Sequence, residues 1–106
     1  MTLERLCAVD DLAPGEARRF DVGGVRVALV RIGDDFYAIG DRCTHQDVSL
    51  AEGEVHADTL ELECAKHGSC FSLVTGVPSS LPATRPTPTY TVHVDGRDVL
   101  IDLEAT

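Results

Sequence analysis

The distribution of hydrophobic and polar residues along this 106-residue chain predicts short β-strands separated by tight turns. In the segment 25–32, aliphatic residues at alternate positions give one strongly apolar face, as expected of a half-buried strand. The dipeptides Gly-Gly at 23–24 and Gly-Asp at 33–34 flank this segment and are typical of two-residue hairpin turns. We therefore expect a three-stranded antiparallel meander made of residues 17–22, 25–32 and 35–39.

The remainder of the chain continues this pattern and lacks helical periodicity. Further strands are expected at residues 4–9, 59–63, 69–74, 90–94 and 98–103. Asp95 and Gly96 join the last two as a hairpin. No segment of helical length combines capping residues with a 3.6-residue period. The sequence thus predicts an all-β fold, an antiparallel β-sandwich or barrel, as a single domain over residues 1–106.

A proline-rich segment interrupts the strand pattern before residue 90. Pro78, Pro82, Pro86 and Pro88 are too closely spaced for a helix or a central strand. Too little chain follows for a second domain, so a linker is not expected. We expect this segment to be an ordered loop.

Composition and charge limit the classes of partner. The net charge of −9 disfavours nucleic acid and anionic membrane surfaces, and favours a protein partner with a basic face. No apolar run approaches the roughly 20 residues that a membrane helix requires, and the first residues do not resemble a signal peptide. We expect a cytoplasmic protein, in which cysteines more often bind metal or stay free than form disulfides.

Two cysteines and two histidines form two short mixed pairs. One residue separates Cys43 from His45, two separate Cys64 from His67, and 18 residues lie between the pairs. Structural zinc sites usually take two cysteines or two histidines from each pair. One thiolate and one imidazole from each loop suit a two-iron cluster, with both thiolates on one iron and both imidazoles on the other, as in Rieske centres. A zinc-stabilised binding module remains an alternative.

The residues around these pairs resemble the Rieske signature, which is C-x-H, a spacer and then C-x-x-H-G-S-x-F. Over almost the whole chain, length and order of elements are similar to the small Rieske-type ferredoxins of multicomponent ring-hydroxylating oxygenases. The resemblance implies one 2Fe-2S cluster per chain, bound by Cys43, His45, Cys64 and His67. It also implies a cluster-binding subdomain at approximately residues 41–75, covered by the proline-rich loop.

The resemblance also implies the function. We expect a monomeric one-electron carrier without catalytic residues, which passes electrons from a flavin-dependent reductase to a terminal non-heme iron oxygenase. Two other electron-transfer roles stay open, an accessory of iron–sulfur assembly and a small subunit of an assimilatory nitrite reductase. The two imidazoles at the loop tips are expected to be the entry and exit for electrons.

The signature indicates the range of the reduction potential. Rieske proteins of respiratory chains resemble this motif but add a cysteine to each loop and a tyrosine two residues after the motif serine. Here Ala65 and Lys66 occupy the second loop, and Phe71, which donates no hydrogen bond, stands at the tyrosine position. Ser69 remains a possible donor to a bridging sulfur. We expect a potential in the lower half of the range of about −150 to +300 mV.

Other chemically active residues match neither pair. Cys7 is expected to be a small buried residue, Cys70 a buried or idle thiol, and His56 and His93 surface histidines. Four acidic residues near the ligand pairs are expected to form a docking rim for a basic partner: Asp41, Asp47, Glu52 and Glu54.

Overall fold

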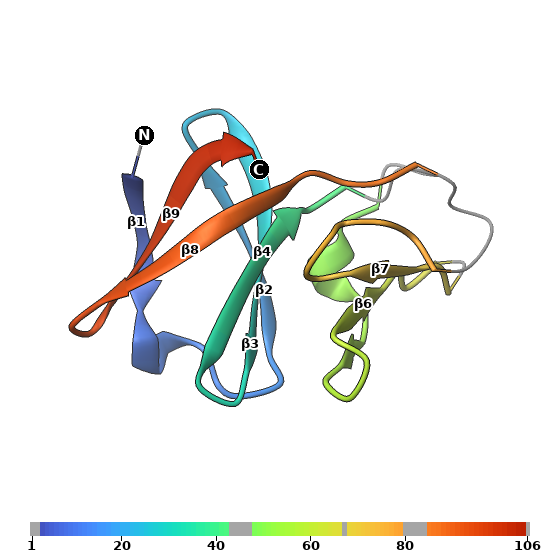
Figure 1. The fold of residues 1–106 in the computed structure, drawn as a ribbon, viewed down its shortest axis with the longest axis horizontal. Helices are drawn as coiled ribbons and strands as arrows, with labels where there is room; N and C mark the ends of the chain where they lie inside the picture. Colours follow the sequence, from blue (N-terminus) through green and yellow to red (C-terminus); the bar gives the residue numbers. More distant parts are fainter. Residues whose placement is uncertain (1–2, 43–47, 67, 80–84, 106) are drawn as a thin grey trace.

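The computed structural model describes residues 3–42, 48–66, 68–79 and 85–105, and confirms the predicted all-β fold. Its strands form one large and one small antiparallel sheet (Figure 1). The large sheet contains β1 (Leu3–Ala8), β2 (Ala17–Val22), β3 (Val25–Ile32), β4 (Asp35–Gly40), β8 (Thr89–Asp95) and β9 (Asp98–Ala105). The small sheet contains β5 (Val55–His56), β6 (Glu61–Glu63) and β7 (Cys70–Ser72). Two single 3₁₀ turns, η1 (Val9–Asp11) and η2 (Leu50–Glu52), are the helical elements of the described ranges.

The large sheet curls into a nearly closed barrel. Its strand order is β1-β9-β8-β4-β3-β2, and the two edge strands β1 and β2 contact each other. The N-terminal strand therefore pairs with the C-terminal strand, with Cys7 opposite Val99. Within the described ranges, no helix reaches the length and hydrophobicity that a membrane crossing requires.

The central meander follows the predicted boundaries closely. Strands β2 and β3 begin and end as expected, and β4 is one residue longer, ending at Gly40. The β2–β3 turn places Gly23 at φ +55° and Gly24 at φ +79°. Both angles lie in the left-handed region that a type I′ hairpin turn requires at both central positions. The local sequence is therefore sufficient to define this hairpin.

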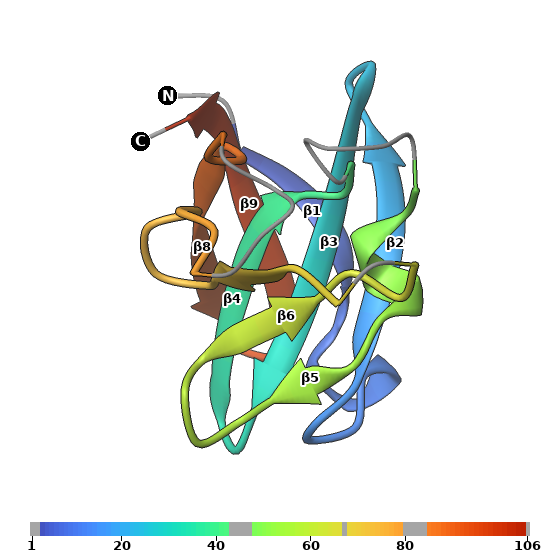
Figure 2. The ribbon, with the colours of Figure 1, turned by 90° about the vertical axis from the view of Figure 1, so that its right-hand side faces the viewer.

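Strand β3 has two buried faces, whereas the sequence predicted one. Val27 and Leu29 point into the barrel, while Ala28 and Val30 point outward against the small sheet. The barrel core consists of Cys7, Leu12, Val27, Leu29, Ala38, Val99 and Ile101. The core between barrel and small sheet consists of Ala28, Val30, Ile39, Leu50, Leu62, Cys64, Phe71 and Leu73. Strand β3 is buried on both faces because β5 and β6 cross over the outer face of β3 and β4, as Figure 2 shows.

The strands of the small sheet are shorter than predicted. The expected strand 59–63 begins only at Glu61, because Leu60 takes a left-handed conformation with φ +55°. The expected strand 69–74 ends at Ser72, and Val74 lies in the following turn with 59% of its surface exposed. The alternation of apolar and polar residues continues into both turns, so the sequence did not indicate where β6 begins or where β7 ends.

The described ends of the proline-rich segment are fixed to both sheets. On its N-terminal side, the Ser79 N–H donates to the Cys70 carbonyl at 2.8 Å. On its C-terminal side, the Pro88 carbonyl accepts from the Gly40 N–H at 2.8 Å. Such anchoring is expected of an ordered loop. Pro82 lies outside the described residues, and the covering of the cluster stays a prediction.

Candidate metal centre

The predicted metal site joins two loops that leave the small sheet and the barrel. Cys64 directly follows β6 and is fully buried, and it belongs to the core between the two sheets. Cys43, His45 and His67 lie outside the described residues, so their assignment as ligands stays a prediction. The described residues nevertheless define the stems of both loops.

The second loop is the turn of the β6–β7 hairpin, as predicted. The Cys64 N–H donates to the Ser69 carbonyl at 2.7 Å, and the Gly68 N–H donates to the Cys64 carbonyl at 3.0 Å. Gly68 has φ +76°, a conformation that glycine adopts at little cost. These bonds close the turn and fix the backbone of Cys64. Ser69 is also fully buried, and its role as a donor to sulfur stays a prediction.

The first loop is closed at its base by Asp41. This carboxylate accepts hydrogen bonds from the Ser49 hydroxyl at 2.6 Å and from the Ala51 N–H at 2.8 Å. The Asp41 carbonyl also accepts from the Leu50 N–H at 2.7 Å, and Arg42 forms a β-bridge with Ser49. The described residues on either side of the first loop, 41–42 and 49–51, are thereby held together.

Asp41 was predicted to belong to the docking rim, and the structure shows that this is wrong. Its side chain has 0% exposure and lies 3.7 Å from the Arg19 Nε atom. Burial without these partners would be costly for a carboxylate, and the three groups that face it supply the compensation. Glu52 and Glu54 are exposed, as the rim requires, and Asp47 lies outside the described residues.

The stems of the two loops lie directly against each other. The Glu63 N–H donates to the Glu54 carbonyl at 2.9 Å. A β-carbon added at Gly53 would overlap the Glu63 carbonyl oxygen and lie 3.3 Å from the Ala65 nitrogen. The chain leaving the first loop therefore passes within backbone contact of the residues on either side of Cys64.

The described ligand position suits a thiolate bound to iron. Among the described cysteines, Cys7, Cys64 and Cys70 are all free of disulfide bonds. The Cys64 side chain is completely buried in the core that also contains Leu62 and Phe71. An apolar surround limits solvent access to a cluster and thereby influences its potential.

The remaining cysteines and histidines differ in their surroundings. Cys7 is only 5% exposed, as predicted, and burial raises the pKa of its thiol. His93 is exposed, also as predicted. The His56 side chain is 31% exposed, and its Nε2 atom lies 2.9 Å from Glu63 Oε1. The hydrogen bond with Glu63 raises the pKa of His56. Sequence reasoning missed this pair, because it depends on the register of the two-residue strand β5.

Comparison with known proteins identifies the family. The model of the Rieske 2Fe-2S domain matches residues 2–91. The chain is 47% identical over 97 residues to the 3-phenylpropionate/cinnamic acid dioxygenase ferredoxin subunit of Shigella boydii serotype 4 (strain Sb227), covering 92% of this chain and 90% of the relative.

Solved structures agree with this relationship. The ferredoxin of carbazole 1,9a-dioxygenase from Nocardioides aromaticivorans IC177 superposes with a TM-score of 0.94 and 40% identity, covering 98% of this chain and all of that one. A ferredoxin in complex with the reduced oxygenase of carbazole 1,9a-dioxygenase superposes with a TM-score of 0.89 and 39% identity. The match covers 98% of this chain and 95% of that ferredoxin. The family match excludes the zinc-module alternative. The chain belongs to the Rieske 2Fe-2S family and is a ferredoxin of the dioxygenase systems, an electron carrier with a Rieske cluster.

Proposed function

We propose that this ferredoxin takes single electrons from a flavin-dependent reductase and delivers them to a terminal non-heme iron oxygenase. The observation that carries this proposal is the 47% identity, over nearly the full length of both chains, to a dioxygenase ferredoxin subunit. A related ferredoxin that is 39% identical forms a complex with its oxygenase, which supports the oxygenase as electron acceptor. We further expect the chain to act as a cytoplasmic monomer.

The proposed ligands are the four residues of the two mixed pairs. Cys43 and Cys64 would bind one iron, and His45 and His67 the other. The closed hairpin turn at Cys64 and the Asp41-bound stem of the first loop support this assignment, because each fixes the base of one loop. The backbone bond from Glu63 to Glu54 holds the two stems against each other. We assign residues 41–75 to the cluster-binding subdomain of one Rieske domain.

When bound, the cluster supplies one-electron chemistry, and the protein sets the potential at which it occurs. Imidazoles replace two thiolates, so the reduced state carries less negative charge and the potential rises above that of four-cysteine clusters. Phe71 is fully buried and has no hydroxyl group, so it donates no hydrogen bond that would raise the potential further.

We predict that a coulometric redox titration under anaerobic conditions takes up one electron per chain. The midpoint should lie in the lower half of the Rieske range, below about +75 mV, because the disulfide and tyrosine of the high-potential proteins are missing. A midpoint near the top of the range would contradict this interpretation of Phe71. Uptake of two electrons per chain would contradict the single-electron role itself.

The acidic surface beside the first loop is expected to guide docking. Glu52 lies at the end of η2 and is exposed, close to the segment that holds His45 in the sequence. We predict that Glu52→Lys slows electron transfer to the oxygenase about three- to tenfold at low ionic strength, and that added salt removes the difference. Stopped-flow oxidation of the reduced ferredoxin measures this rate.

The matched control for this experiment is Asp95→Lys. Asp95 is exposed in the β8–β9 hairpin, which Figure 1 shows at the far end of the barrel from the small sheet. Asp95→Lys makes the same change in net charge as Glu52→Lys. Its rate of electron transfer to the oxygenase should stay within about twofold of the wild-type rate. Equal slowing by both variants would indicate an effect of total charge and would contradict a local docking rim.

A further inference from the structure

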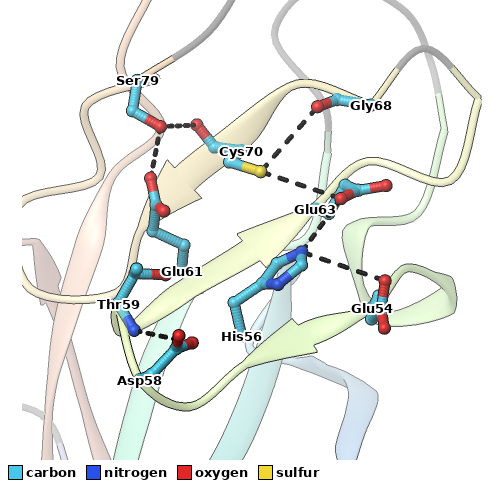
Figure 3. Close-up of polar contacts among 9 residues, drawn as sticks. All are labelled: Glu54, His56, Asp58, Thr59, Glu61, Glu63, Gly68, Cys70 and Ser79. Carbon is cyan, nitrogen blue, oxygen red and sulfur yellow. Dashed lines mark hydrogen bonds and ion pairs between the residues drawn. The ribbon is translucent and has the colours of Figure 1, made fainter.

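A second group of metal-binding side chains lies on the outer face of the small sheet. Neighbouring strands pair His56 with Glu61 and Glu63 with Cys70. Alternate residues of the same strands, such as Leu62, point inward to the core. His56, Glu63 and Cys70 therefore project together from β5, β6 and β7, away from the barrel (Figure 3).

The donor atoms of these three residues are close together. His56 Nε2 lies 2.9 Å from Glu63 Oε1, and Cys70 Sγ lies 3.9 Å from the same oxygen. One ligand atom from each residue lies within 4.8 Å of the others, and all three residues are partly buried. Figure 3 shows Glu54 beside them, with its Oε2 atom 3.9 Å from His56 Nε2.

The three donors are of the types that zinc prefers. Zinc in proteins is bound by imidazole nitrogen, thiolate sulfur and carboxylate oxygen, at about 2.0–2.3 Å and in tetrahedral geometry. Tetrahedral donors are then separated by about 3.5 Å. Two of the present separations, 2.9 and 3.9 Å, lie on either side of that value, and no two of the three donor atoms are more than 4.8 Å apart.

We propose that His56, Glu63 and Cys70 bind one zinc ion at a site separate from the four ligands assigned to the cluster. Glu54, whose side chain is 73% exposed, or a water molecule completes the tetrahedron. The thiol of Cys70 loses its proton on binding, and the ion replaces any proton on His56. The bound zinc joins all three strands of the small sheet, including β6, which leads into Cys64.

The site can be tested on the oxidised holoprotein with Zn²⁺ as the probe. Calorimetric titration should give one saturable site per chain, with visible absorption and iron content unchanged. X-ray absorption at the zinc edge detects zinc separately from iron, and should show one sulfur neighbour at about 2.3 Å with nitrogen and oxygen at about 2.0–2.1 Å. Zinc should also raise the thermal midpoint, since it binds the folded sheet.

Three variants distinguish this site from incidental binding. His56→Gln and Cys70→Ser should each weaken zinc binding at least about tenfold, and Cys70→Ser should remove the sulfur neighbour from the zinc spectrum. His93→Gln, which changes an exposed histidine on β8, should bind zinc like the wild type. The His56 variant leaves Glu63, the neighbour of Cys64, unchanged, so the cluster should stay intact.

Four results would overturn the proposal. They are the absence of a saturable site, a zinc spectrum without sulfur, unchanged affinity in His56→Gln, and zinc uptake accompanied by an equal loss of iron. The last would mean that zinc displaces the cluster metal. None of these results bears on electron transfer by the zinc-free protein, so the test is independent of the proposed function.

Discussion

Replacing Cys64 by alanine is expected to leave the purified protein without its iron and without electron-transfer activity. Cys64 is the proposed thiolate ligand on the second loop, and alanine offers no donor atom to replace it. Its neighbours in the buried core, Leu62 and Phe71, offer no metal ligand either. Iron and sulfide content per chain, measured after anaerobic purification together with visible absorption, should fall to background.

Two other cysteines provide matched controls for this variant. Cys7→Ala removes a buried sulfur from the barrel core, at a cost of about 1 kcal/mol in stability, and should keep the iron of the wild type. Cys70→Ala removes the thiol nearest in sequence to the second loop, and should also keep its iron. A Cys64→Ala protein with wild-type iron would disprove the ligand assignment, and iron loss in all three would indicate unspecific damage.

The parts of the fold that sequence patterns could predict are those determined by neighbouring residues. The β2–β3 hairpin is one example, because Gly23 and Gly24 provide the two left-handed residues that its turn requires. The turn between β6 and β7 is another, because backbone bonds that join Cys64 to Gly68 and Ser69 close it locally. These features depend on chain segments of only a few residues, so tertiary contacts do not alter them.

Features that depend on contacts between distant parts of the chain could not be predicted from the sequence patterns. Asp41 looked like a surface acid, but its burial depends on Ser49 and Ala51 returning to it after the first loop. His56 looked isolated, but strand pairing places it against Glu63. Strand β3 looked half-buried, because its pattern contains no information about a second sheet on its outer face. In each case the contact is made by another segment of the chain, and the periodicity of the sequence does not determine where that segment lies.

The second large effect is expected at Gly53, where the stems of the two loops meet. Its backbone has φ −86° and ψ −172°, which any residue can adopt, so conformational freedom does not explain a glycine here. The reason is steric, because an added β-carbon would overlap the Glu63 carbonyl oxygen and lie 2.8 Å from its carbon. Those atoms are backbone and cannot rotate away. Gly53→Ala must therefore displace one stem from the other.

We expect Gly53→Ala to destabilise the protein by about 3 kcal/mol, the upper range for overpacking. We also expect it to release iron faster than the wild type, because the displaced backbone at Glu63 leads directly into Cys64. Thermal midpoints by circular dichroism at one scan rate report the stability. The decay of visible absorption in the presence of an iron chelator reports the retention of the cluster.

Gly24→Ala is the control that separates these two effects. Gly24 has φ +79° with open space around it, so alanine there costs about 1–2 kcal/mol through backbone strain alone. Its hairpin joins β2 to β3 in the barrel, and neither loop stem includes it. We expect Gly24→Ala to lower the thermal midpoint and to keep a normal rate of iron release. If both variants lose iron in proportion to their loss of stability, close contact between the stems has no specific role in holding the metal.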